Sequence, residues 1–192
     1  ARGATDGKSG QAMSMTKWFD TNYHYIVPEF LPETAFSLSS ERLFSEVREA
    51  KALGHAVKAV LLGPVSFLYL GREKAEGFDR LSLLPGLLPV YRRILSRLHD
   101  EGVEWVQMDE PVLGLDIGEK WRSSFSRAYG ELSGQGVKLL LATYFSSLDE
   151  HVAEVCSLPV DGLHIDAVRG RKDLPDILRM WPEEKVLSVG IV

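Results

Sequence analysis

Five short apolar runs recur along the chain, separated by stretches with helical periodicity. The runs are AVLLGPVSFL (59–68), VEWVQMDEPVL (103–113), VKLLLATYF (137–145), VDGLHIDAV (160–168) and KVLSVGIV (185–192). Each is almost continuously hydrophobic where it begins, which is typical of parallel strands buried on both faces. This alternation predicts an α/β fold with a parallel sheet and right-handed crossovers.

Amphipathic patterns between these runs predict five helices. Three of them, 43–53, 88–98 and 121–132, are followed by a glycine. Glycine is the residue that most readily adopts the left-handed conformation that ends many helices. Two shorter patterns, around 148–155 and 174–178, complete the set.

An eleven-residue run near the front, TKWFDTNYHYI (16–26), is interpreted as a further strand, which gives six strands. A complete (βα)₈ TIM-type barrel has eight strands and typically about 250 residues. The 192-residue chain therefore fits an incomplete barrel with about six of eight strands. A complete doubly wound sheet would show the same alternation of strands and helices. However, its first strand should lead into a glycine-rich phosphate loop, and no GxGxxG or GxxxxGK[ST] motif occurs in the sequence. We expect a flexible arm or loop over 1–14 and a partial barrel over 15–192.

Charge and cysteine content narrow the classes of function. The net charge of −5 gives no electrostatic reason to bind nucleic acid or an anionic membrane. Cys156 is the only cysteine, so the chain has no internal disulfide, and we expect a reducing, cytoplasmic compartment. Cys156 lies on the apolar side of a predicted helix, so we interpret it as a small buried hydrophobic residue rather than a nucleophile.

Polar residues follow the apolar part of three predicted strands. WVQM precedes Asp109 and Glu110, LLLA precedes Thr143 and Tyr144, and GLHID carries His164 and Asp166. The carboxyl ends of parallel barrel strands open on one face, where active sites are built, so these residues predict a shared pocket. The alternative is that each strand simply becomes polar where it meets solvent.

The candidate residues also have structural interpretations. Asp109 and Glu110 could act as an acid/base pair, but adjacent strand residues point to opposite faces, so one carboxylate could instead serve a neighbouring loop. His24 and His164 could be ligands or proton carriers, although two histidines without a third partner are weak support for zinc.

The aromatic segment MTKWFDTNYHYIVPEF (15–30) contains the remaining candidates: Lys17, Trp18, Asn22 and His24. An ammonium beside an aromatic ring can bind a carboxylate while the ring offers a stacking surface. A solvated lysine at a strand entrance is the alternative.

This segment resembles the hallmark segment of the cobalamin-independent methionine synthase family. KAVLLGPVSFLYLG, FDRLSLLPGLLPVY, GVEWVQMDEPVL, KLLLATYF, LPVDGLHIDAV and KVLSVGIV are similar to its amino-terminal half in the same order, from about Met15 to Val192. One departure is Ser14, where the family pattern suggests an acidic residue.

The resemblance implies a two-barrel methyltransferase of methionine, and hence amino-acid, biosynthesis. Such enzymes move a methyl group from 5-methyltetrahydropteroyl-polyglutamate to homocysteine and use zinc, held by the carboxy-terminal barrel, and no cobalamin. The amino-terminal barrel supports that barrel and helps to hold the folate tail, with Lys17 at the folate-contacting position. The resemblance further implies that two strands precede Ala1, that the zinc barrel is absent here, and that this chain alone has no catalytic or metal-binding residues and is inactive.

Two other classes of function fit parts of the sequence. A stand-alone folate-binding module would need the same cation but no catalysis. Another barrel enzyme, such as a uroporphyrinogen-decarboxylase-like enzyme or a glycosidase, is the second alternative. A glycosidase would need two separated carboxylates, and the sequence has only one good acid cluster at a strand end.

Overall fold

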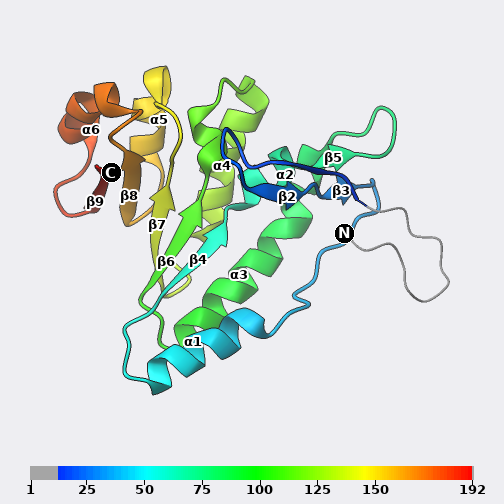
Figure 1. The fold of residues 1–192 in the computed structure, drawn as a ribbon, viewed down its shortest axis with the longest axis horizontal. Coiled ribbons are helices and arrows are strands. Elements are labelled where there is room, and N and C mark those ends of the chain that lie inside the picture. Colours follow the sequence, from blue (N-terminus) through cyan, green and yellow to red (C-terminus); the bar gives the residue numbers. More distant parts are fainter. Residues whose placement is uncertain (1–12, 192) are drawn as a thin grey trace.

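A parallel sheet of five strands forms the centre of the computed structural model, which describes residues 13–191 (Figure 1). The spatial order is β4-β6-β7-β8-β9, with each neighbouring pair parallel. The bounds are β4 Lys58–Leu62, β6 Trp105–Asp109, β7 Lys138–Ala142, β8 Gly162–Asp166 and β9 Val186–Gly190. The predicted parallel α/β arrangement is confirmed, and all five carboxyl ends lie at the same end of the sheet.

Six helices accompany the strands in the part of the chain that the structure describes, and five of them are the predicted ones. They are α1 Arg42–Ala52, α2 Pro64–Tyr69, α3 Leu84–Asp100, α4 Glu119–Leu132, α5 Val152–Ser157 and α6 Leu174–Met180, with short 3₁₀ turns η1 Arg80–Leu83, η2 Pro111–Gly114, η3 Asp149–His151 and η4 Arg171–Asp173. The glycines after α1, α3 and α4 have φ values of 83°, 70° and 73°, as predicted for residues that end helices. Cys156 is buried in α5, as predicted.

The two faces of the sheet differ in their environment. Val106, Met108, Leu141 and Leu163 are completely buried, and they belong to the core that the helices share with one face. On the other face, Val60 is 49% exposed. Strand register aligns the open-face residues in rows, of which one is Leu62, Asp109, Ala142, His164 and Ser188. This open face therefore carries polar residues toward the carboxyl end of the sheet.

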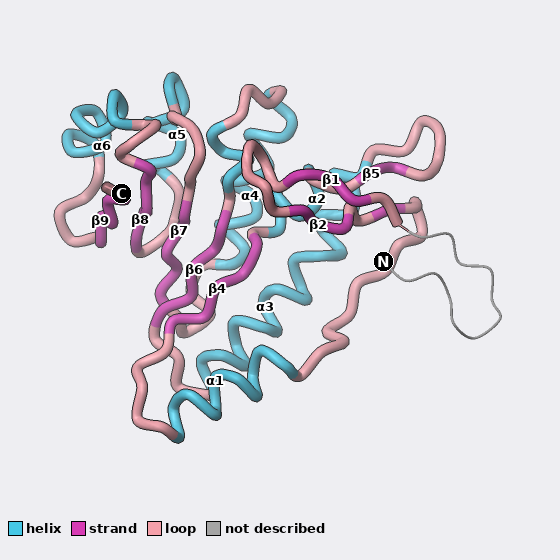
Figure 2. The backbone as a smooth tube through the Cα atoms, viewed as in Figure 1, coloured by secondary structure: helices cyan, strands magenta, loops and turns pink. Residues whose placement is uncertain are grey.

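The aromatic run does not form the sixth strand of this sheet, so that prediction is wrong. Met15–Lys17 (β1) and His24–Ile26 (β2) pair antiparallel as a separate hairpin, visible beside the main sheet in Figure 2. The chain turns back because Thr21 Oγ1 donates to the carbonyl of Trp18 and Trp18 N donates to the carbonyl of Tyr23. A further two-stranded sheet joins β3 (Glu29–Phe30) to β5 (Arg72–Glu73).

The run 59–68 was predicted as one strand and is also corrected. The strand β4 ends at Leu62, and Pro64 begins helix α2. Proline suits the first helical position because its missing N–H would have no partner there and its φ is already helical. Of the predicted arm 1–14, residues 1–12 lie outside the described residues.

Candidate site at the carboxyl end of the sheet

Asp109, at the end of β6, lies at the centre of a polar network on the open face. Its carboxylate accepts hydrogen bonds from Gln107 Nε2 at 2.8 Å and from the Tyr144 hydroxyl at 3.4 Å. Gln107 Oε1 in turn accepts from Lys58 Nζ at 2.6 Å. Burial raises the pKa of Asp109, although the bonds from Gln107 and Tyr144 oppose this shift. Burial and the nearby Asp109 charge also raise the pKa of Tyr144, so its hydroxyl stays a donor.

His164 lies two strands away from Asp109 on the same row of the sheet. Its Nδ1 is 2.8 Å from Ser188 Oγ on β9. Burial, together with the positive charge of Lys58, lowers the pKa of His164, which favours the neutral ring. The side chain can thus exchange a hydrogen bond with a polar ligand on the open face without carrying a charge.

Asp166, at the end of β8, serves the backbone of the surrounding loops. Its two carboxylate oxygens accept from Phe145 N at 3.1 Å and from Val168 N and Arg169 N at 2.9 Å each. Burial alone would raise the pKa of Asp166, but these donors and the Arg169 charge outweigh it and lower the pKa. Asp166 therefore shapes the rim of the site as a charged structural group.

Glu110 is separated from the other predicted residues. Its carboxylate is completely buried on the helix side, where it accepts from Ser66 N at 2.8 Å, Val65 N at 3.3 Å and the Tyr129 hydroxyl at 3.0 Å. Burial raises the pKa of Glu110 to about 7. The two neighbouring carboxylates thus point in opposite directions, as strand geometry predicts, and Glu110 serves the amino end of α2.

The hairpin brings Trp18 to this end of the sheet. The rings of Trp18 and Phe19 have centroids 5.2 Å apart, and the ring of Phe19 lies 5.8 Å from that of Phe145, just after β7. Lys17 is exposed on β1, directly before Trp18, and pairs in register with His24. Asn22 and His24 are also exposed, and the Asn22 carbonyl lies 3.1 Å from His24 Nδ1.

The structure therefore brings together Trp18, Asp109, Tyr144, His164 and Asp166, and it leaves Glu110 inside the core. Sequence reasoning missed Gln107, Ser188 and Arg169. Gln107 could have been found, because it alternates with Asp109 and shares its face. Ser188 could not, because its contact with His164 depends on strand register.

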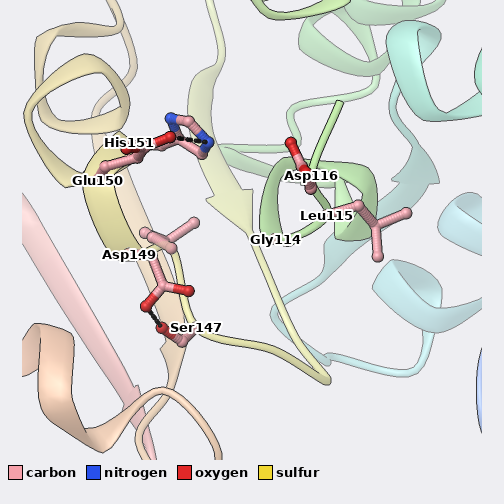
Figure 3. A pocket seen from close by; sticks show the side chains of 8 residues that line it. Gly114, Leu115, Asp116, Ser147, Asp149, Glu150 and His151 are labelled. Atoms are coloured by element: carbon pink, nitrogen blue, oxygen red, sulfur yellow. Dashed lines mark hydrogen bonds and ion pairs between the residues drawn. The ribbon is translucent and has the colours of Figure 1, made fainter. Parts of the chain in front are cut away.

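A cavity of about 270 Å³ lies between the end of η2 and the loop after β7 (Figure 3). Its lining includes Asp116, Asp149, Glu150 and His151, and Figure 3 shows the His151 ring beside the Glu150 carboxylate. Two of these carboxylates have cationic partners, since Arg122 contacts Glu150 and Lys172 contacts Asp149. None of the residues predicted for the site lines this cavity.

Comparison with known proteins gives the family of the chain. The family model described as "Cobalamin-independent synthase, N-terminal domain" matches residues 1–192. The chain belongs to this family. The resemblance seen in the aromatic segment and the ordered motifs is therefore confirmed.

Two solved structures share the fold of this cobalamin-independent synthase domain. A B12-independent methionine synthase from Shewanella sp. W3-18-1, in complex with selenomethionine, has a TM-score of 0.62 at 11% identity and is matched over 87% of this chain and 63% of its own. A methyltransferase from Methanosarcina mazei has a TM-score of 0.61 at 12% identity, matched over 92% of this chain and 59% of its own. The chain thus spans less than two thirds of either structure.

Proposed function

We propose that this synthase domain is part of an amino-terminal (βα)₈ barrel in a zinc-dependent methyltransferase that forms methionine. The parent reaction moves a methyl group from 5-methyltetrahydropteroyl-polyglutamate to homocysteine in the cytoplasm. The family match over the whole chain carries this proposal. The parallel sheet with one open face supports the barrel, because closing such a sheet would enclose the row of Asp109 and His164.

Zinc enters this proposal only as a group held by another barrel. Among residues 13–191, no three His, Cys, Asp or Glu side chains come together to hold a metal ion. The best candidate metal ligands already have hydrogen-bond partners. His164 contacts Ser188, and Asp109 accepts from Gln107 and Tyr144. The residues described here do not fit a zinc site, and we assign no step of the reaction to them.

In this proposal, the chain holds the acidic folate tail and supports the carboxy-terminal barrel. Lys17 is exposed on the hairpin strand that leads into Trp18, and Trp18 connects to the carboxyl end of β7 through the rings of Phe19 and Phe145. An exposed ammonium beside this end can attract successive glutamate carboxylates, while the aromatic rings offer flat surfaces. Weaker polar contacts would come from Asn22, His24, Asp109, Tyr144, His164 and Asp166. Catalysis would belong to the carboxy-terminal barrel.

No helix within 13–191 combines the length and the apolar character that spanning a membrane requires. The partners in this proposal are the folate, homocysteine on the other barrel, and that barrel itself. We expect the 192-residue chain, mixed with methyl-folate and homocysteine, to form no methionine.

Calorimetric titration of the chain with folate triglutamate tests the role of Lys17. We expect Lys17→Ala to weaken binding by about fivefold, equivalent to about 1 kcal/mol for an exposed ion pair. The loss should shrink at high salt, because exposed charges are screened. Lys138→Ala is the matched control, since Lys138 is an exposed lysine in the first position of β7, at the opposite end of the sheet.

The outcomes separate the candidate functions. Binding that depends on Lys17 supports a tail site. Binding of equal strength in both variants would refute the role of Lys17, and no binding by the unmodified chain would leave only a supporting role for this domain.

A further inference from the structure

A continuous series of aromatic contacts joins the hairpin to the end of β7. Ring centroids are separated by 5.4 Å between Tyr25 and Trp18, 5.2 Å between Trp18 and Phe19, 5.8 Å between Phe19 and Phe145, and 4.7 Å between Phe145 and Tyr144. Within residues 13–191, β1 and β2 pair only with each other, so side chains rather than strand hydrogen bonds fix the tip of the hairpin against the main sheet. The Phe19–Phe145 contact is the step that crosses between them.

Both residues at this crossing have left-handed backbones. Phe19 has φ 52° and Phe145 has φ 71°. This region costs a bulky L-residue roughly 1–2 kcal/mol, so it persists only where surrounding contacts hold it. At Phe145 one such contact is visible, because Asp166 accepts a hydrogen bond from its N–H. The crossing therefore needs further contacts that hold the two turns together.

Arg169 makes contacts on both sides of the crossing. Its Nη1 donates to Asp20 Oδ2 at 2.6 Å, on the hairpin turn, and to the Phe145 carbonyl at 3.3 Å. Its guanidinium also lies 5.6 Å from the centroid of the Phe145 ring. The backbone of Arg169 is itself fixed, since its N–H donates to Asp166.

We propose that Arg169 is a positioning residue that holds the hairpin, through Asp20 and Phe145, against the carboxyl end of the sheet. In the context of the proposed folate-tail site, on which this part of the inference rests, Arg169 thereby sets the place of Lys17 without contacting the ligand. Arginine suits this role because one planar group can serve an ion pair, a carbonyl and a ring at once. The Arg169 and Asp20 side chains are 47% and 57% exposed, so the ion pair alone contributes little and the three contacts act together.

Hydrogen exchange of the full 192-residue chain measures local opening of the hairpin. Its tip contains the bonds from Trp18 N to the Tyr23 carbonyl and from Thr21 N to the Trp18 carbonyl. We expect Arg169→Gln to accelerate exchange across 15–26 by about tenfold and Asp20→Asn by about threefold, because each substitution removes interactions that oppose local opening of the hairpin. Exchange across β6 should not change.

A conservative variant and a control variant separate positioning from general stability. Arg169→Lys keeps the charge but loses the planar group, so we expect exchange between that of the unmodified chain and Arg169→Gln. Arg48→Gln removes another ion pair, Arg48 to Glu101 at 2.5 Å, far from the hairpin, and should leave 15–26 unchanged. Thermal unfolding of all variants identifies any global loss.

The same variants are titrated with folate triglutamate. Faster exchange together with weaker binding in Arg169→Gln supports the proposal. Unchanged exchange overturns it, and weaker binding at unchanged exchange would instead make Arg169 a ligand contact. Faster exchange with unaltered binding supports the hold on the hairpin and refutes the part that concerns Lys17. If the unmodified chain does not bind the folate but Arg169→Gln accelerates exchange, the positioning role stands and the folate-tail proposal fails.

Discussion

Asp109 and Glu110 are neighbours whose carboxylates have opposite surroundings. Asp109 faces the open side of the sheet with Gln107 and Tyr144, whereas Glu110 is enclosed by α2 and Tyr129. Sequence alone predicted that only one of them enters the site, because strand side chains alternate. Which one does so depends on the face that the helices cover, and residue spacing does not supply that information.

The buried Glu110 predicts a dependence of stability on pH. Its pKa rises from 4.5 to about 7 on folding, so the folded chain binds a proton more tightly than the unfolded chain. The stabilising contribution is full below about pH 4.5 and is lost as pH rises through about 7. At about 1.4 kcal/mol per pKa unit, the loss is on the order of 3 kcal/mol.

Denaturant unfolding of the chain and of Glu110→Gln, at pH 5 and pH 8, measures this effect. We expect the free energy of unfolding of the unmodified chain to fall relative to that of Glu110→Gln as pH rises. The variant corrects for all other titrating groups, including His164. A difference that stays constant between the two pH values would contradict the assignment.

At the scale of elements, helices were easier to predict than the aromatic segment. Helical periodicity and the terminal glycines Gly54, Gly102 and Gly134 are local signals, and the structure retains them. The run 16–26 is rich in strand-forming residues, but Asp20-Thr21-Asn22 forms its turn, so composition concealed a hairpin. These three turn-forming residues were the available signal. The contacts of Arg169 with Asp20 join residues 149 positions apart, and no local pattern reveals them.

The close approach of Gly63 to Glu110 gives a prediction for the β4–α2 junction. A Cβ at Gly63 would collide with the Glu110 carboxylate, although its φ of −68° suits any residue. We expect Gly63→Ala to lower the free energy of unfolding by about 3 kcal/mol, because the carboxylate would lose its donors in α2. Gly130→Ala, within α4 and with open space around its Cα, should raise it by about 1 kcal/mol. Equal effects of the two substitutions in thermal or denaturant unfolding would refute the close-approach explanation.

At the scale of the whole molecule, the parallel sheet and the family were both predictable from ordered motifs. The sheet has edges at β4 and β9 in the described residues, and barrel closure belongs to the proposal. We propose that the hairpin and the carboxyl ends of the strands form one ligand-binding end. Side-chain contacts run from Trp18 through Phe19 and Phe145 to Tyr144, whose hydroxyl donates to Asp109.

Hydrogen exchange with and without folate triglutamate shows whether these parts bind the ligand together. We expect slower exchange in 15–26 and in the segments that follow β6, β7 and β8, and no change in the segments that precede these strands. Protection confined to the amino ends of the strands, around 101–105 and 134–138, would contradict it.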